Sequence, residues 1–302
     1  MDDNGQSTSA KNPYVIADGG ACHDGDCRKM IALVEAAAEA GCDAYKTQWT
    51  SRPVAMARRR GAAEADGYAA IYRRYLAWPE GWHSGLHDAC RRVGIDYICT
   101  VFLPEDVEAI APYVAKFKVA SFEAEDFSLL GAIRPVRDGR DVLISCGMQD
   151  WSDFLPEMYR AAVYSMFGTT GSDVIWMHCV SAYPAPMSAQ HLRLFNQPVG
   201  LSGYSDHTDP VETWTGAVAL AVSRRVRFIE AHLRLDETDP ANPDFPHAMT
   251  PAQFAQYVRT IRLAAVALGD GPKRIEECEA AMLRYKVGAP INRLIEDPTG
   301  GR

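Results

Sequence analysis

Eight short runs rich in β-branched and aromatic residues recur along this sequence, and they constrain its fold more than any other feature. They lie at 13–18, 43–48, 96–102, 116–121, 141–147, 174–180, 199–205 and 226–232. Stretches with the three-to-four spacing of amphipathic helices lie between them, at 27–41, 81–94, 104–114, 150–168, 209–225 and 250–269. Eight strands that alternate with helices predict a parallel sheet, and at this chain length they predict a closed (β/α)8 TIM barrel.

A doubly wound open sheet is the structural alternative. The loop after the first run reads DGGACHDG and lacks the G-x-G-x-x-G fingerprint of a dinucleotide-binding sheet, so the barrel is favoured. We expect a disordered lead-in at 1–12, the barrel at 13–270 and a C-terminal tail at 271–302. The segment 49–80 is too long for a simple connection and is interpreted as a lid or an insertion.

Composition narrows the class of protein. The net charge of −8 argues against nucleic-acid binding, which needs a basic surface. No stretch approaches the roughly 20 apolar residues of a membrane span, and the polar start MDDNGQSTSAKNP is not a secretory signal. The 8 cysteines are scattered, which is typical of reduced thiols. We therefore expect a cytoplasmic protein that binds neither nucleic acid nor a membrane.

Polar residues stand where the predicted strands end. The active site of a barrel is built at the carboxyl ends of its strands, so these side chains should converge. They are Asp18, Lys46, Gln48, Thr100, Lys118, Ser121, Glu123, Ser145, Ser181, Tyr183, Ser205, Asp206, His207, Glu230 and His232. This convergence predicts an enzyme.

Two of these residues, Lys46 and Lys118, lie in otherwise apolar strands. A buried ammonium is costly unless a carboxylate or a bound anion faces it. Together with the hydroxyls of the neighbouring strand ends, the lysines predict a pocket for a phosphate and a carboxylate. The alternative is that each lysine forms a structural ion pair, for instance with Glu123 or Glu230.

Histidines end two adjacent predicted strands. His207 and His232 are expected to hold a divalent metal with positions left open for water and substrate. The alternative for each is a hydrogen-bonded core residue or a general acid–base. His178 lies in mid-strand and is expected in the core. The segment CHDGDC at 22–27 does not match a common zinc spacing, and His23 is expected to shape the first loop.

Eight motifs of this chain resemble the sialic acid synthase family in order and spacing. They are VIADGGACHDG, AYKTQ, YICTVF, KFKVASFE, LISCGM, MHCVSAYPAP, GYSDHT and FIEAHL. The resemblance covers roughly residues 13–270. It implies a condensation of phosphoenolpyruvate with the aldehyde of a sugar or sugar-like acceptor, assisted by Mn²⁺ or Mg²⁺, that gives a 2-keto-3-deoxy acid and phosphate.

The resemblance also implies roles for individual residues. Glu123 is expected to handle water or proton transfer and His207 and His232 to bind the metal. Asp18, Gln48 and Asp244 are expected to contact the acceptor. The phosphoenolpyruvate contacts are expected to be Lys46, Thr100, Lys118, Ser121, Ser145, Tyr183 and Ser205, and we expect Lys46 and Lys118 to be catalytic as well.

The chain departs from the family pattern mainly on the acceptor side. Cys22 replaces the usual Asn, Asp18 stands where Glu is common, and Glu125 and Asp126 stand where Asn is usual. The segment after the last predicted helix is too short for the family's antifreeze-like domain, which supplies an arginine to the partner's sugar site. We therefore expect an acceptor other than an N-acylmannosamine, and a homodimer by analogy only.

Two rival functions remain open at this point. One is a metal-dependent aldolase or lyase that acts on a phosphorylated sugar without phosphoenolpyruvate. The other is a non-catalytic barrel that serves as a scaffold. The second is less favoured because competent residues fill every predicted metal and phosphoenolpyruvate position.

Overall fold

The computed structural model describes residues 12–62, 67–150, 155–198, 200–269 and 271–287. The chain divides into two units between Leu268 and Gly269. Every described strand belongs to the first unit, and the second contains a 3₁₀ helix, η6, at Glu277–Tyr285. Except for Asn12, the predicted lead-in lies outside the described residues, as does the end of the predicted tail. None of the described helices has the length and apolar character that a membrane span requires.

Eight parallel strands close into a barrel, which confirms the predicted (β/α)8 fold. They are β1 Tyr14–Gly20, β2 Ala44–Trp49, β3 Asp96–Val101, β4 Lys116–Val119, β5 Val142–Ser145, β6 Val174–His178, β7 Leu201–Asp206 and β8 Phe228–His232. The barrel closes because β1 pairs with both β2 and β8, with Asp18 opposite Lys46 on one side and His232 on the other. The alternative of an open sheet is therefore wrong.

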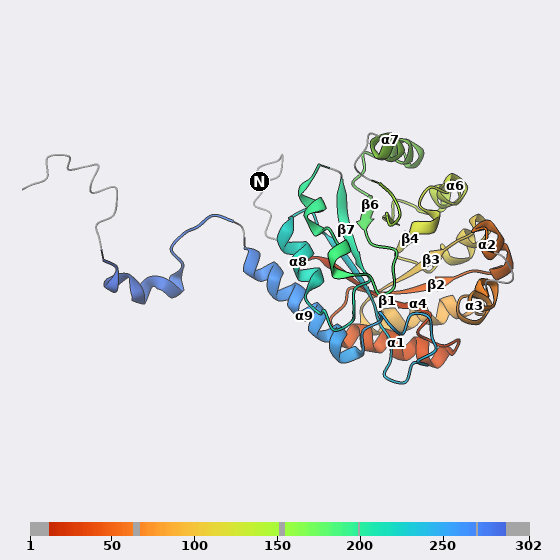
Figure 1. Cartoon of the computed structure of the whole chain (residues 1–302), viewed down its shortest axis with the longest axis horizontal. Coiled ribbons are helices and arrows are strands. Elements are labelled where there is room, and N and C mark those ends of the chain that lie inside the picture. Colours follow the sequence, from red (N-terminus) through yellow and green to blue (C-terminus); the bar gives the residue numbers. More distant parts are fainter. Residues whose placement is uncertain (1–11, 63–66, 151–154, 199, 270, 288–302) are drawn as a thin grey trace, which may run out of the picture. The chain divides into compact units, whose positions relative to one another are not determined.

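The helices lie around the outside of the strands, as Figure 1 shows. Outside the segment 49–80 they are α1 Cys27–Glu39, α4 Trp82–Val93, α5 Val107–Ile110, α6 Phe127–Val136, α7 Leu155–Phe167, α8 Thr215–Val222 and α9 Pro251–Leu268. The predicted helix at 104–114 is shorter than expected, since a 3₁₀ turn, Pro104–Asp106, precedes α5. The sequence did not predict α6, which contains Pro135. The carboxylate of Asp126, the residue before the helix, caps it by accepting from the N–H groups of Ser128 and Leu129.

The inner face of the barrel explains where the site lies. An apolar layer fills the interior and includes Ile16, Ala44, Ile98, Leu143 and Phe228. Because side chains on a strand alternate between its two faces, the residue two positions further along each strand also points inward. Those residues are Asp18, Lys46, Thr100, Ser145 and Glu230. The polar floor of the site is thus the next layer above a packed apolar one.

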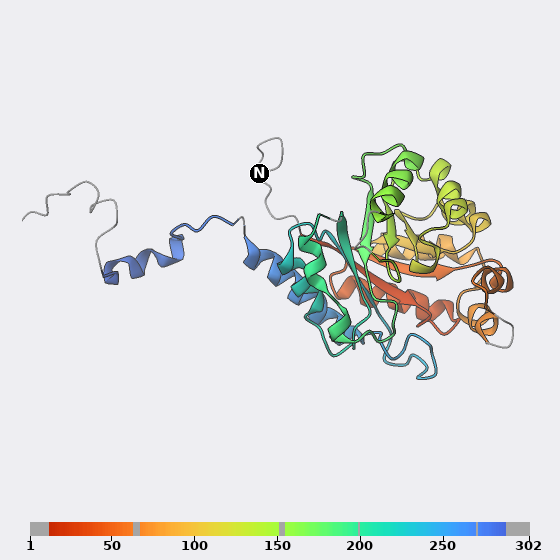
Figure 2. The ribbon, with the colours of Figure 1, turned by 45° about the horizontal axis from the view of Figure 1, so that its top comes forward.

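The segment 49–80 forms two helices, α2 Pro53–Arg59 and α3 Tyr68–Tyr75, which lie side by side in Figure 1 and Figure 2. They pack with the residues that follow β1 and β3. This α2–α3 cluster consists of Ala21, Met56, Ala57, Tyr72, Tyr75, Leu76, Phe102 and Leu103. The insertion therefore covers the carboxyl ends of the first strands, apart from residues 63–66, which lie outside the described residues.

Candidate active site

A cavity of about 430 Å³ lies at the carboxyl ends of the strands; seven of the eight strands contribute to its lining, and after β6 the following loop contributes Ser181 and Tyr183. It brings together every predicted site residue except Glu123. The predicted residues in its lining are Asp18, Lys46, Gln48, Thr100, Lys118, Ser121, Ser145, Tyr183, Ser205, His207, His232 and Asp244. The convergence expected of the strand ends is therefore present.

Two buried ammonium groups and two buried carboxylates form the floor of the cavity. Lys46 Nζ lies 2.6 Å from Asp18 Oδ2 and 3.5 Å from Glu230 Oε1. Lys118 Nζ lies 3.8 Å from the same Glu230 oxygen and donates to Ser145 Oγ at 2.6 Å. The ion pair of each lysine with Glu230 is present, as the alternative interpretation expected, and the pocket for a phosphate and a carboxylate stays a prediction.

The two lysines differ in how well their charge is compensated. Burial lowers the pKa of each, but Asp18 and Glu230 outweigh this effect at Lys46, whose pKa is raised. At Lys118 burial prevails, the repulsion from Lys46 adds to it, and the pKa is lowered. The Lys118 ammonium therefore gains more than Lys46 from a further anion in the cavity.

The carboxylates of the floor stay ionised. Burial alone would raise the pKa of Asp18, but Lys46 and His232 hold it below its ordinary value. The pKa of Glu230 is lowered in the same way, since Lys118 and Lys46 offset its burial. Glu230 Oε1 accepts from Ser205 Oγ at 2.9 Å, while Glu230 Oε2 is buried without a hydrogen-bond partner.

Serine hydroxyls line the cavity near Lys118. Ser121 Oγ accepts from the N–H of Gly147 at 3.1 Å, and the buried Ser181 Oγ has no partner. A Cβ on Gly147 would overlap Ser181 Oγ and approach Ser121 Oγ to 2.8 Å, so only glycine leaves these hydroxyls room. Together with Ser145, they offer donors to an anion near Lys118.

Three imidazoles line the same cavity. His207 Nδ1 lies 2.7 Å from the carbonyl oxygen of Val180, so that nitrogen carries the proton and Nε2 keeps its lone pair. The ring centroids of His207 and His232 are 5.6 Å apart, and those of His232 and His247 are 4.4 Å apart. The sequence predicted the first two rings and missed His247.

The donor group that could hold a cation centres on His232. One donor atom each from His232, Asp244 and His247 lies within 4.8 Å of the others. His232 Nδ1 and both ring nitrogens of His247 are buried without a hydrogen-bond partner, which is unfavourable unless something coordinates them. Burial and the neighbouring His232 lower the pKa of His247 to about 3, so its ring is neutral, as a metal ligand must be. These residues fit a divalent metal.

Gly20 lets this group assemble. Its φ is +45°, a conformation that favours glycine, and any Cβ there would overlap Asp244 Oδ2 and approach His232 Nδ1 to 3.1 Å. The Asp244 carboxylate is fixed by the N–H of Ala21, which donates to Oδ2 at 2.6 Å. The second glycine of the DGG motif, Gly20, is therefore needed because any side chain there would collide with Asp244.

Glu123 is the predicted site residue that does not line the cavity. Arg60 binds both of its oxygens, with Nε at 2.7 Å from Oε1 and Nη2 at 2.8 Å from Oε2. Burial raises the pKa of Glu123, although Arg60 opposes the change. Arg60 itself lines the cavity. Sequence reasoning missed it because it follows a short helix within a segment interpreted only as a lid or an insertion.

The motif GYSDHT divides its residues between the two faces of the barrel wall. Ser205 and His207 face the cavity. Asp206 instead faces the helices, where it accepts from Tyr257 Oη at 3.0 Å and from the Thr215 hydroxyl. Its Oδ1 also accepts from Thr208 Oγ1 at 2.8 Å. The charged residue of the motif is thus an anchor for α8 and α9.

Of two other histidines, His23 lies where the sequence indicated, whereas His178 is not in mid-strand: it is the last residue of β6 and is only half-buried. His178 packs at the end of β6, with Nε2 2.7 Å from the Gln190 carbonyl oxygen, and is absent from the cavity lining. His23 Nδ1 accepts from the N–H of Gly25 at 2.9 Å and so shapes the loop after β1.

Comparisons with known proteins point to one family and one fold. The model of the NeuB family matches residues 33–273. The chain is 26% identical to N-acetylneuraminate-9-phosphate synthase of Mus musculus, with 98% of this chain and 82% of that protein covered. It is 28% identical to N,N'-diacetyllegionaminic acid synthase of Legionella pneumophila, covering 90% and 77%. The N-acetylneuraminic acid synthetase structure from Leptospira borgpetersenii shares the fold, with a TM-score of 0.76, 22% identity and 91% and 92% of the chains covered.

Proposed function

The chain belongs to the NeuB family, and on that premise we propose that it condenses phosphoenolpyruvate with an aldehyde to give a 2-keto-3-deoxy acid and phosphate. Membership makes it a carbon–carbon bond-forming transferase of the sialic-acid-synthase type. The observation that carries the proposal is the pair of buried ammonium groups beside a cluster of hydroxyls. Phosphoenolpyruvate has both a phosphate and a carboxylate, and each matches such donors.

The reaction balances with one water. Carbon 3 of phosphoenolpyruvate bonds to the aldehyde carbon, whose oxygen takes up a proton. Water adds to carbon 2 and loses a proton, and phosphate leaves by C–O cleavage, which forms the keto group. The contacts proposed for the anion are Lys46, Thr100, Lys118, Ser121, Ser145, Tyr183 and Ser205, all in the cavity lining.

We assign the proton-handling carboxylate to Glu230. Its lowered pKa keeps it ionised at neutral pH, and its Oε2 has no partner. Glu123 was expected in this role, but Arg60 occupies both of its oxygens. Glu230 lies between the two lysines, so a water that attacks carbon 2 of a bound phosphoenolpyruvate would meet a free carboxylate oxygen there.

His232, Asp244 and His247 would hold a divalent cation, with His207 beside them. Two imidazoles and a carboxylate suit Mn²⁺ better than Mg²⁺, which prefers oxygen ligands. When bound, such a cation supplies Lewis-acid polarisation of the aldehyde oxygen. Asp244 was expected to contact the acceptor and is proposed here as a metal ligand, while Asp18 and Gln48 remain the proposed acceptor contacts.

Phosphate release tests the proposal. The protein is incubated with phosphoenolpyruvate and Mn²⁺, with and without each of several aldehydes, among them N-acetylmannosamine. We expect aldehyde-dependent release of phosphate together with a 2-keto-3-deoxy acid identified by mass spectrometry. We also expect slow turnover of N-acetylmannosamine, since the acceptor side departs from the family pattern, and brisk turnover would refute that part.

The rival aldolase or lyase makes a different prediction for the melting temperature. A ligand that binds only the folded state raises it, so phosphoenolpyruvate alone should stabilise a synthase. Cleavage of a phosphorylated sugar without phosphoenolpyruvate, and no stabilisation by phosphoenolpyruvate, would favour the rival.

A further inference from the structure

One side of the cavity is apolar, in contrast to its charged floor. Five of the residues come from α3 and the position after it, at spacings of three and four that place them on one face of the helix. We call this side the aromatic wall; it consists of Tyr68, Ile71, Tyr72, Tyr75, Leu76 and Phe122.

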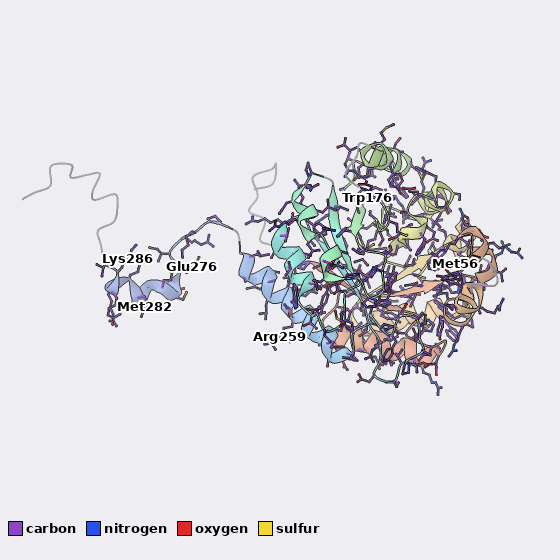
Figure 3. All side chains as sticks on the ribbon, viewed as in Figure 1. Met56, Trp176, Arg259, Glu276, Met282 and Lys286 are labelled. Atoms are coloured by element: carbon purple, nitrogen blue, oxygen red, sulfur yellow. The ribbon has the colours of Figure 1, made fainter. Side chains whose placement is uncertain are left out.

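The base of the wall is fixed by packing, while its rim is open. Tyr72, Tyr75 and Leu76 are buried in the α2–α3 cluster, whose Met56 is labelled in Figure 3 on the side where α2 lies. Tyr68 and Phe122 are 49% and 56% exposed. A helix whose only task is to cover the barrel would bury its whole apolar face, so the exposed rim indicates an apolar partner in the cavity.

Arg60, the charged group that contacts the wall, is compensated by Glu123, which does not line the cavity. Arg60 gives two donors to Glu123, and its Nη1 donates to Tyr72 Oη at 3.1 Å. Its guanidinium carbon lies 4.4 Å from the ring centre of Phe122 and 5.0 Å from that of Phe102. The guanidinium therefore serves to join the aromatic rings, and its charge is balanced by Glu123.

A polyhydroxylated chain is a poor match for this wall. Each hydroxyl that leaves water needs a hydrogen-bond partner, and the wall offers only its tyrosine hydroxyls, of which that of Tyr72 already accepts from Arg60. A flat apolar group instead gains from the same burial. Resting on the proposed condensation, we infer that the acceptor is an aldehyde whose far end is an apolar or aromatic group that packs against the aromatic wall.

Two aldehydes that differ by one group test the inference. Benzyloxyacetaldehyde and glycolaldehyde have the same reacting end, and only the first carries a benzyl group. Phosphate release is measured with each, and with N-acetylmannosamine, in the presence of phosphoenolpyruvate and Mn²⁺. Because a buried phenyl ring contributes to binding, we expect kcat/KM for benzyloxyacetaldehyde to exceed that for glycolaldehyde by on the order of tenfold or more.

A substitution in the aromatic wall tests whether the preference for the benzyl compound arises there. Ile71 is 37% exposed, so Ile71→Ser should leave the fold intact. It should reduce the ratio of kcat/KM for the benzyl compound to kcat/KM for glycolaldehyde about threefold or more, mainly through a higher KM for the benzyl compound. Val218→Ser is the matched control, since Val218 is also a helical residue with 37% exposure and does not line the cavity.

The outcomes separate the inference from the function on which it rests. Equal kcat/KM for the two matched aldehydes, a preference for N-acetylmannosamine, or an Ile71→Ser variant with unchanged preference would overturn the aromatic-end acceptor and leave the condensation standing. No phosphate release with any of the aldehydes would overturn the condensation, and the inference with it.

Discussion

Lys46 and Lys118 are both buried, but they differ in the negative charge around them. Lys46 compensates Asp18 at 2.6 Å, so Lys46→Met would leave a buried carboxylate without its cation. We expect a loss of about 3–5 kcal/mol in the free energy of unfolding. Lys118 has a lowered pKa and only a 3.8 Å approach to Glu230, so Lys118→Met should change stability by about 1 kcal/mol or less and abolish phosphate release.

Urea unfolding measures the loss of stability in each variant, and phosphate release measures the loss of activity. Lys116→Met is the control, because Lys116 begins the same strand as Lys118, pairs with Asp141 at 3.3 Å and does not line the cavity. It should keep its activity. Equal destabilisation by Lys46→Met and Lys118→Met would show that the compensation of charge inferred for the floor is incorrect.

His83 gives a stability that depends on pH. It is fully buried, its Nδ1 lies 2.9 Å from Tyr97 Oη, and burial lowers its pKa from 6.5 to about 4. Between these values the unfolded chain binds a proton that the folded chain does not, so stability falls as the pH decreases from 6.5 to 4. The full loss is on the order of 3 kcal/mol for this residue.

Replacing the ring should remove that part of the pH dependence. We expect His83→Gln to lose less stability than the wild type between pH 7 and pH 4, measured by urea unfolding at each pH. His87→Gln on the same helix is the control, since His87 is only half-buried. The same decline in His83→Gln and in the wild type would contradict the assignment to His83.

At the scale of elements, Gly216 sets how closely α8 approaches α9. A Cβ there would lie 2.8 Å from Tyr257 Cζ and 2.9 Å from Ile261 Cδ1, and Tyr257 is held by its hydrogen bond to Asp206. Gly216→Ala should therefore destabilise the barrel by about 1–3 kcal/mol. Gly85→Ala in α4, where a Cβ meets nothing within 4 Å, should stabilise it by about 0.5–1 kcal/mol.

Thermal unfolding measures the change in stability of each variant. The two changes can be compared directly because both variants replace a helical glycine with alanine. A stabilised Gly216→Ala variant would show that α8 shifts at little cost, and that the anchor on Asp206 does not fix its position.

The elements also show why the sequence predicted the strands better than it predicted some helices and long-range contacts. Strands of a closed barrel are buried on both faces, so they stand out as apolar runs. The helix α6 contains Pro135 and Gly131, both poor helix formers, and tertiary packing decides its formation. The polar residues at the ends of these runs predicted that Asp18, Lys46 and Glu230 would meet at the barrel mouth. The runs cannot show that Arg60 binds Glu123, because that pair joins segments distant in the sequence.

Over the whole molecule, the net charge does not show which charged groups meet in the cavity. The chain carries −8, yet two ammonium groups meet in its cavity. Net charge therefore excluded classes of partner but could not predict the ligand. His247 was missed for a related reason: it lies in the long connection between β8 and α9, where no periodicity indicates which residues return to the barrel mouth.

That connection predicts a stabilising effect of metal on the whole fold. His232 ends β8, whereas Asp244 and His247 belong to the connection, so a cation bound by all three ties the connection to the barrel. At a free Mn²⁺ concentration of 100 times Kd, mass action adds about 2.7 kcal/mol, or a rise in melting temperature of roughly 5–10 °C for a domain of this size. Calorimetry of chelator-treated protein with and without Mn²⁺ measures it. His247→Gln should lose most of the rise and His87→Gln should keep it, whereas an equal rise in both variants would mean that His247 does not bind the cation.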